Sequence, residues 1–154
     1  MIVTGAGISA NSGIPTYRDN DGLWQHNKPI QHQEFIDDLS QRQRYWARSA
    51  LGWPTVEQAN PNAAHYALVE LETKGRISLL VTQNIDRLHQ KAGHTNIIDL
   101  HGRLDQAICL KCNHLEKRSL VQLRLIEQNM LLSQLTANAL ADGDADIPDG
   151  IVKK

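Results

Sequence analysis

A short β-branched run that breaks into a glycine turn opens the chain, Met1-Ile-Val-Thr-Gly-Ala-Gly-Ile-Ser9. The run predicts a strand, and Gly5 and Gly7 can take positive φ and let the backbone approach a ligand closely. The N–H groups of a helix beginning near Ile8 would point at an anion with the positive end of the helix dipole. This Gly-x-Gly-x-x-Ala pattern predicts a phosphate cradle, and the glycines alone leave a tight turn without a ligand as the alternative.

The segment after the turn differs from that of an ordinary dehydrogenase. Dinucleotide-binding dehydrogenases place an acidic residue about 20 residues beyond the turn, at the end of a second strand. In this chain Ile14-Pro-Thr-Tyr-Arg-Asp19 follows instead, and it reads as a loop. A nucleotide held at the turn would therefore meet a loop rather than a second strand.

The rest of the chain alternates helices and strands. Apolar residues among polar ones over residues 32–50 predict one or two amphipathic helices, which Pro54 would close. Asn60-Pro-Asn62 predicts the start of another helix, with Gly75 as its end. Strands alternating with helices are typical of a parallel α/β sheet. The elements predicted beyond Gly75 are strands over Ile77–Val81, Asn96–His101 and Leu104–Leu110, and a helix over Arg118–Met130.

Polar residues follow two of these strands. Thr82-Gln-Asn-Ile-Asp86 comes directly after the first, with Asn84 as the predicted N-cap of a short helix to Ala92, and His101 ends the second. Open parallel sheets bind ligands at the carboxyl ends of their strands. The sequence therefore predicts that the glycine turn, the loop beginning at Gln83 and His101 line one crevice.

His101 is the predicted general base, because imidazole titrates near neutral pH. For a single histidine at a strand end, a packed or capping role is the alternative that the residues alone leave open. The other histidines of this region, His65, His89, His94 and His114, are predicted to be structural or exposed.

The two cysteines, Cys109 and Cys112, have the Cys-x-x-Cys spacing of a metal or redox site. Thiolates three positions apart suit tetrahedral zinc, but a closed site needs four ligands. No further cysteine follows Cys112, although His114 could supply a third ligand. The redox interpretation is weaker, because Cys109 follows a strand-like run rather than opening a helix.

The charged residues are mixed along the chain. The formal net charge of −1 over 154 residues gives no electrostatic case for nucleic acid or an anionic membrane. No apolar run approaches the roughly 20 residues of a spanning helix. We expect a cytoplasmic protein, or a mitochondrial one if a presequence precedes Met1. Residues 139–154, acidic and then basic around Pro148, predict a disordered or truncated tail.

Four stretches carry a resemblance to a known family. They are Gly5-Ala-Gly-Ile-Ser9, Ser12-Gly-Ile-Pro-Thr-Tyr-Arg-Asp19 with Asp21-Gly-Leu-Trp24, Thr82-Gln-Asn-Ile-Asp86, and Asp99-Leu-His-Gly102 followed by Cys109-Leu-Lys-Cys112. In order and approximate spacing they resemble the sirtuins, the NAD-dependent protein deacylases. His32-Gln-Glu-Phe35, Arg44-Tyr-Trp-Ala-Arg48 and Gly52-Trp-Pro54 resemble the subgroup with bacterial and mitochondrial lipoamidase-like members.

The resemblance implies a fold, a reaction and a set of site residues. The fold is α/β, a partial Rossmann-like parallel sheet with helices plus an incomplete zinc-binding small module. The reaction transfers an acyl group from lysine in a protein substrate to the ADP-ribose part of NAD and releases nicotinamide, with His101 as the catalytic base. The cofactor-binding residues implied are Gly5, Ala6, Gly7 and Ser9 near the pyrophosphate, Tyr17 and Arg18 in the cofactor loop, Gln83 at the ribose, and Asn84 and Asp86 on the nicotinamide side.

The resemblance also implies a domain plan. A partial NAD-binding domain would span residues 1–103 with a helical insertion over about 25–75, and an incomplete zinc ribbon would span 104–138, with structural zinc on Cys109 and Cys112. Tyr45 and Arg48, three apart on a predicted helix, resemble the pair that some sirtuins use for acidic acyl groups. Relatives continue with a second cysteine pair, so we expect an incomplete sirtuin. The alternatives are a catalytically inactive remnant that binds a nucleotide or a partner, and a zinc-dependent assembly module in which two chains share four thiolates.

Overall fold

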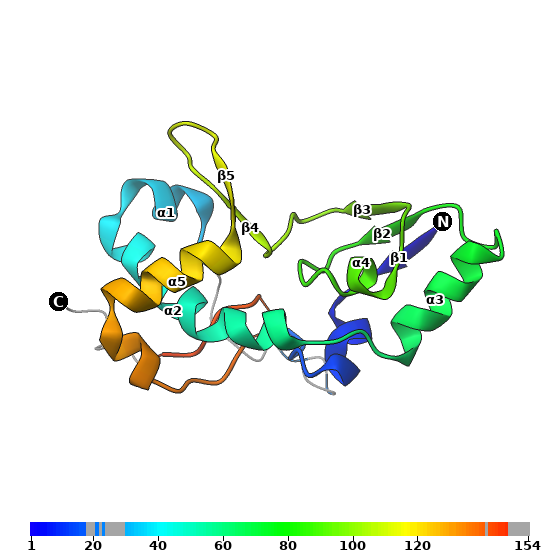
Figure 1. Ribbon diagram of the computed structural model, residues 1–154, viewed down its shortest axis with the longest axis horizontal. Coiled ribbons are helices and arrows are strands. Elements are labelled where there is room, and N and C mark those ends of the chain that lie inside the picture. The colour runs from blue at the N-terminus through cyan, green and yellow to red at the C-terminus, as the bar shows by residue number, and fades with distance from the viewer. Residues whose placement is uncertain (18–20, 22, 24–29, 141, 148–154) are drawn as a thin grey trace.

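The computed structural model describes residues 1–17, 21, 23, 30–140 and 142–147. Its central element is a three-stranded parallel sheet of β1 (Ile2–Thr4), β2 (Leu80–Thr82) and β3 (Ile97–Asp99), in the order β1-β2-β3 (Figure 1). The predicted strands are confirmed, although β2 begins three residues later than the apolar run from Ile77. Arg18 and Trp24 lie outside the described residues.

Three helical segments lie around this sheet. The 3₁₀ helix η1 (Ala6–Ser12) follows β1 directly, where the sequence predicts a helix start. Helices α3 (Ala63–Thr73) and α4 (Leu88–Ala92) pack against each other beside the strands (Figure 1). Leu80 and Leu88 are fully buried, so the core of this half lies between sheet and helices.

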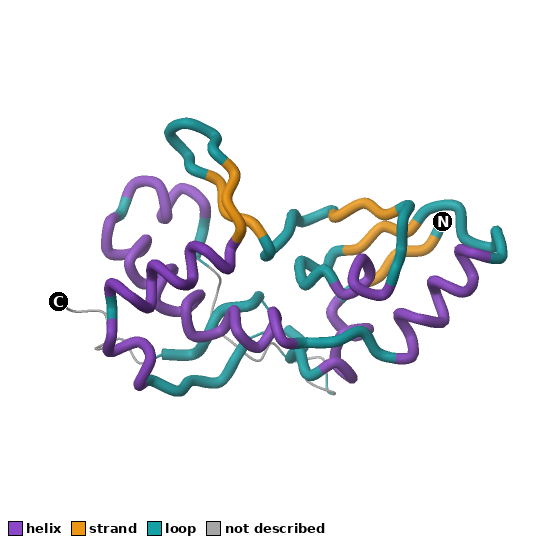
Figure 2. The backbone as a smooth tube through the Cα atoms, viewed as in Figure 1, coloured by secondary structure: helices purple, strands orange, loops and turns teal. Residues whose placement is uncertain are grey.

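A second lobe holds most of the remaining helices, as Figure 2 shows: α1 (His32–Asp37), α2 (Leu39–Gln58), α5 (Arg118–Gln128) and η2 (Met130–Gln134). Arg118 fastens α5 to α2, because its guanidinium lies over the rings of Trp46 and Trp53, 5.6 and 4.9 Å from their centroids. Such cation–π contacts stabilise most when they are desolvated, and Arg118 is buried.

The prediction that Pro54 ends the first helical region is wrong, since α2 continues through Pro54 to Gln58. Proline removes the N–H that would bond to the carbonyl of residue 50, and a helix interior normally suffers from that loss. Here the side chain of Gln122 donates its Nε2–H to the carbonyl of Ala50 over 2.7 Å. A neighbouring helix thus satisfies the carbonyl that the proline leaves unpaired.

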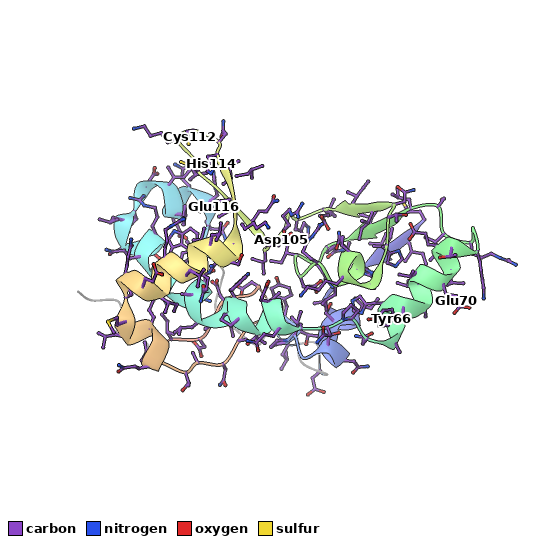
Figure 3. All side chains as sticks on the ribbon, viewed as in Figure 1. Tyr66, Glu70, Asp105, Cys112, His114 and Glu116 are labelled. Carbon is purple, nitrogen blue, oxygen red and sulfur yellow. The ribbon has the colours of Figure 1, made fainter. Side chains whose placement is uncertain are left out.

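The cysteine pair lies on an antiparallel hairpin of β4 (Gln106–Ile108) and β5 (Leu115–Lys117). Cys112 and His114 lie toward its tip, away from both lobes (Figure 3). The strand over β4 was predicted, and β5, whose Leu115 is exposed, has no clear apolar pattern in the sequence.

Residues 139, 140 and 142–147, part of the predicted disordered or truncated tail, pack against the rest of the protein. Ala139 and Ala145 form an antiparallel bridge, and Leu140, Ala145 and Ile147 are buried. The turn between them packs against α2 at Gly52, where an added Cβ would overlap the carbonyl carbon and oxygen of Asp144. Because Gly52 has no side chain, α2 leaves space for this segment, which has no helical or strand periodicity of its own.

Replacing Asn62 by alanine should lower the free energy of unfolding by about 1–2 kcal/mol, because a side-chain N-cap is lost. Its Oδ1 accepts from the Ala64 N–H at 2.9 Å, while its Nδ2 donates to the Ile8 carbonyl and Ser12 Oγ at 2.8 and 2.9 Å. Urea denaturation measures the change. Asn60→Ala, which removes one exposed hydrogen bond to Gln58, is the matched control and should change little.

Candidate functional site

The ends of all three strands meet at one edge of the sheet. The N–H of Gln83, just after β2, donates to the carbonyl of Thr4 at the end of β1 over 3.0 Å. The N–H of Leu100, just after β3, donates to the carbonyl of Thr82 over 2.8 Å. The glycine turn, the loop beginning at Gln83 and the segment leading to His101 therefore leave the sheet side by side, as the parallel order requires.

A buried hydrogen-bond network joins the glycine turn to the loop after β2. Ser9 Oγ donates to Asp86 Oδ2 over 2.6 Å. Asn84 Nδ2 donates to the carbonyl of Gly5 over 3.1 Å and to Ser9 Oγ over 3.0 Å. Because Ser9 and Asp86 are buried, these bonds hold two segments some 75 residues apart in the sequence in a fixed relation.

Asp86 also contacts the start of the next helix. Its Oδ1 accepts from the N–H of Leu88, the first residue of α4, over 2.9 Å. The prediction that Asn84 caps this helix is wrong, because α4 begins at Leu88 and its first residue follows Arg87, in the left-handed region at φ 67°. The side chain of Asn84 faces the glycine turn instead.

Neither backbone strain nor packing requires a glycine at position 5 or position 7. Gly5 has extended backbone, φ −144° and ψ −172°, and neither residue is among the described glycines with positive φ. A Cβ added at either position would meet no atom within 4 Å. The missing side chains therefore leave open space beside the turn, which is what close approach of a bound phosphate requires.

Six predicted cofactor-binding residues line a cavity of about 20 Å³ at this edge, enough for roughly one water molecule. Burial is the main cause that raises the pKa of the Tyr17 hydroxyl, and the carboxylates of Asp142 and Asp144 add to it. Leu104 and Val56 complete part of the wall. The six residues are Ala6, Ser9, Tyr17, Gln83, Asn84 and Asp86.

His101 follows β3 at the same edge, with an exposed side chain. An exposed imidazole at this edge is accessible to a ligand and to water, as a general base must be. Arg18, the remaining predicted cofactor residue, lies outside the described part of the chain.

Three buried histidines pack directly behind the glycine turn, where the sequence gives no signal for a cluster. The ring centroids of His65 and His89 are 4.8 Å apart and those of His89 and His94 are 5.2 Å apart. His89 Nε2 lies 2.9 Å from Thr4 Oγ1, and His94 Nδ1 lies 2.9 Å from a carboxylate oxygen of Glu72. The sequence predicts that these histidines are structural or exposed, and in the structure all three are buried.

Two histidines of this cluster disfavour positive charge. Burial, and then the neighbouring rings of His65 and His94, lower the pKa of His89 to about 4. Burial also lowers the pKa of His65. One ring nitrogen of each of the three histidines has no hydrogen-bond partner among the described residues. His65 and His89 are therefore neutral at neutral pH.

Tyr45 and Arg48 are both held by other parts of the protein. The ring of Tyr45 packs edge-on against Phe35 at 5.1 Å between centroids, and burial raises the pKa of its hydroxyl. Arg48 Nε donates to the carbonyl of Ala145 over 3.2 Å and lies 3.6 Å from Asp144 Oδ2. The predicted acyl-binding pair thus has partners inside the chain.

The cysteine hairpin presents two thiols suited to a metal. Backbone N–H groups of Cys112 and then Lys111, followed by the Cys112 side chain, lower the pKa of the Cys109 thiol and favour the thiolate that metals bind. In the part of the chain that the structure describes, no three histidine, cysteine or acidic residues are placed to hold a metal ion. The residues present therefore fit half of a four-ligand zinc site.

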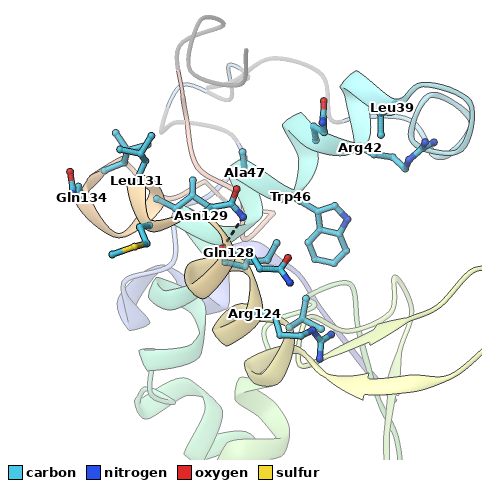
Figure 4. Close-up of a pocket in the computed structure, with 15 residues that line it drawn as sticks. Leu39, Arg42, Trp46, Ala47, Arg124, Gln128, Asn129, Leu131 and Gln134 are labelled. Carbon is cyan, nitrogen blue, oxygen red and sulfur yellow. Dashed lines mark hydrogen bonds between the residues drawn. The ribbon is translucent and has the colours of Figure 1, made fainter. Parts of the chain in front are cut away.

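A cavity of about 1020 Å³ lies elsewhere, between α2 and the segment from α5 to η2 (Figure 4). Trp46, Ala47, Leu125, Gln128 and Leu131 are among its lining residues. None of the predicted site residues that the structure describes lines it. Its size does not make it the reaction site, because the polar groups that chemistry needs converge at the sheet edge instead.

A parallel sheet with a glycine turn after its first strand, and polar side chains at the carboxyl ends of the next two, defines a protein of the Rossmann-like α/β class. More specifically, residues 5–139 match the model of the Sir2 family, and the chain belongs to that family.

Two bacterial relatives support the same assignment. The chain is 49% identical over 149 residues to an NAD-dependent protein deacetylase of Xanthomonas axonopodis pv. citri, covering 97% of this chain and 51% of the relative. It is 50% identical over 147 residues to NAD-dependent protein deacetylase 2 of Bradyrhizobium diazoefficiens, covering 96% and 54%. The chain thus spans about half the length of the curated relatives it matches.

Solved structures agree in fold. A Sir2 homologue in complex with NAD superposes with a TM-score of 0.61 at 42% identity, covering 76% of this chain and 46% of that one. Sir2 in complex with the inhibitor EX-527, 2'-O-acetyl-ADP-ribose and a deacetylated p53 peptide gives a TM-score of 0.69 at 35% identity, covering 81% and 49%.

Among the described helices, none has both the length and the apolar character needed to cross a membrane.

Proposed function

We propose that this protein is an NAD-dependent protein deacetylase, which transfers an acyl group from lysine in a protein substrate to ADP-ribose and releases nicotinamide. The observation that carries the proposal is the buried network of Ser9, Asn84 and Asp86, which fixes the loop after β2 against the glycine turn. This network occurs in a chain that is 49% and 50% identical to two relatives named NAD-dependent protein deacetylases.

The open turn supports the assignment of the pyrophosphate site. Gly5, Ala6 and Gly7 would hold it through their backbone, and Ser9 and Asn84 keep the turn in place. Bound NAD supplies a ribose carbon with nicotinamide as its leaving group. Gln83, exposed at the strand end, would bind the ribose.

The remaining residues would position the cofactor, and one of them would accept a proton. Asn84 and Asp86 would orient the nicotinamide side. Arg18 would help to order the cofactor loop, and Tyr17 would shield the reactive ribose. His101 would accept a proton from a ribose hydroxyl, which suits an exposed imidazole at the strand edge.

Two finer features belong to the same proposal. Cys109 and Cys112 would supply half of a structural zinc site, with the other ligands coming from outside the described residues. Membership of the subgroup with bacterial and lipoamidase-like members, and the boundary at residues 103 and 104, stay predictions from the sequence.

The proposal is tested by calorimetry with ADP-ribose and by mass spectrometry of an acetyl-lysine peptide incubated with NAD. We expect ADP-ribose to bind, and His101→Ala to keep that affinity while losing deacylation by about 10²–10⁴-fold, the usual contribution of a general base. His114→Ala, at the hairpin tip, is the matched control and should change neither. Absence of ADP-ribose binding, or full deacylation by His101→Ala, would contradict the proposal.

A further inference from the structure

The segment of residues 142–147, here called the strap, is fastened to α2 by one side chain. Arg48 Nε donates to the carbonyl of Ala145, 97 residues away, and approaches the carboxylate of Asp144 at 3.6 Å. Arg48, Asp144 and Ala145 are all buried. Because the strap has no helix of its own and only one backbone bridge, Ala139–Ala145, the Arg48 contacts and the packing at Gly52 hold it against α2.

The strap reaches the wall of the candidate cofactor cavity. Gly143 lies so close to Leu104 that an added Cβ would overlap its Cδ1, and the same Cβ would lie 3.6 Å from Val56 Cγ2. Leu104 and Val56 both line the cavity that contains Ser9, Asn84 and Asp86. The strap therefore packs behind two apolar residues of that wall.

We propose that Arg48 is a positioning residue for the candidate cofactor pocket: it holds the strap, and the strap holds Leu104 and Val56 in the pocket wall. This rests on the proposed function only for the identity of the ligand, ADP-ribose. The role differs from recognition of an acidic acyl group, because the guanidinium already faces an internal carboxylate.

The charges around Asp144 make the contact sensitive to pH. Arg48 on α2 and Arg118 on α5 act to lower the pKa of Asp144, and Asp142 on the strap acts to raise it. The charge of Asp144 in turn raises the pKa of the Tyr45 and Tyr17 hydroxyls. Burial, and then Asp142, raise the pKa of Asp144 to about 7, against the opposing effect of the two arginines.

The direction of the pH effect follows from this raised pKa. A carboxyl whose pKa is higher in the docked strap than in the released strap favours docking when it is protonated. Docking is therefore strongest at low pH and weakens as pH rises through about 7. Asp144→Asn, which is neutral at every pH, should stay docked and lose this dependence.

The test measures the strap and the pocket wall separately. Hydrogen exchange of the Leu140 and Asp146 amides, which bond to the carbonyls of Asp144 and Asn138, reports strap docking as a protection factor. The methyl resonances of Leu104 and Val56 report the wall without any ligand. Calorimetry with ADP-ribose reports the affinity.

Arg48→Ala at pH 8 should lower strap protection by about tenfold or more, because a buried carboxylate loses its partner. It should also shift the Leu104 and Val56 methyl resonances and weaken ADP-ribose binding. Gly52→Ala should do the same without touching the arginine, since its Cβ would displace the Asp144 backbone. Alanine favours helix over glycine, so retained helicity by circular dichroism would show that α2 is intact.

Arg76→Ala removes an equal charge from an exposed site remote from the strap and should leave every readout unchanged. Unchanged strap protection in Arg48→Ala, or lost protection with unshifted Leu104 and Val56 methyls, would overturn the proposal. A wild-type chain that fails to bind ADP-ribose would count against the proposed function, while exchange and methyl shifts would still decide the role of Arg48.

Discussion

Asp86→Ala is expected to lower the free energy of unfolding by about 3 kcal/mol, since hydrogen bonds to charged groups contribute roughly 1.5–3 kcal/mol each. The carboxylate accepts from Ser9 Oγ at 2.6 Å and from the Leu88 N–H at 2.9 Å, and both groups are buried. Alanine leaves these two buried donors, the Ser9 hydroxyl and the Leu88 N–H, without partners.

The same variant should weaken ADP-ribose binding, because the Ser9 hydroxyl that positions the glycine turn loses its acceptor. Urea denaturation and calorimetry measure the two effects. Asp37→Ala, which removes a carboxylate that accepts one exposed hydrogen bond from Gln33, is the matched control and should stay within about 0.5 kcal/mol. A loss below about 1 kcal/mol in Asp86→Ala would mean that the network contributes little.

Acidification from about pH 6.5 to about pH 4 is expected to remove up to about 3 kcal/mol of stability through His89. The pKa of His89 is lowered in the folded protein, so the unfolded chain takes up a proton first as the pH falls. The stability that neutral His89 contributes is fully present above its pKa in the unfolded chain, near 6.5. It is lost as the pH falls toward its pKa in the folded protein, about 4. His65 acts in the same direction, because its pKa is also lowered.

Other groups titrate over this range, so the measured quantity is a difference. Asp144 has the opposite sign, since its raised pKa makes the fold more stable as pH falls below about 7. Subtracting the pH profile of His89→Gln from that of the wild type isolates His89. Equal slopes for His89→Gln and the wild type would refute the expectation.

Local patterns predicted most of the sheet half and its site. The β-branched run, the glycine turn and the polar residues after Val81 are each readable within a few residues, and a parallel sheet must bring such strand ends together. Ser9, Gln83, Asn84 and Asp86 accordingly line one cavity. The sequence could not show that the side chain of Asn84 faces the glycine turn rather than capping α4, because asparagine is a favoured N-cap residue.

Long-range contacts account for the predictions that failed. Pro54 ends helices as a rule, and only Gln122, contacting the carbonyl of Ala50 from 72 residues away, lets α2 continue. Residues 142–147 have the composition of a disordered tail, yet Gly52 gives them a place to pack on α2. Three histidines scattered over α3, α4 and the following loop show no periodicity, although their rings touch in the fold.

The sequence by itself determined the family, the strand and turn that open the fold, and the side chains at the carboxyl edge, because these depend on residues adjacent in the chain. The tertiary structure decided which groups those side chains face. Arg48 faces Asp144 rather than solvent, and His89 packs behind Thr4, because burial brings together charges and rings that no local pattern relates.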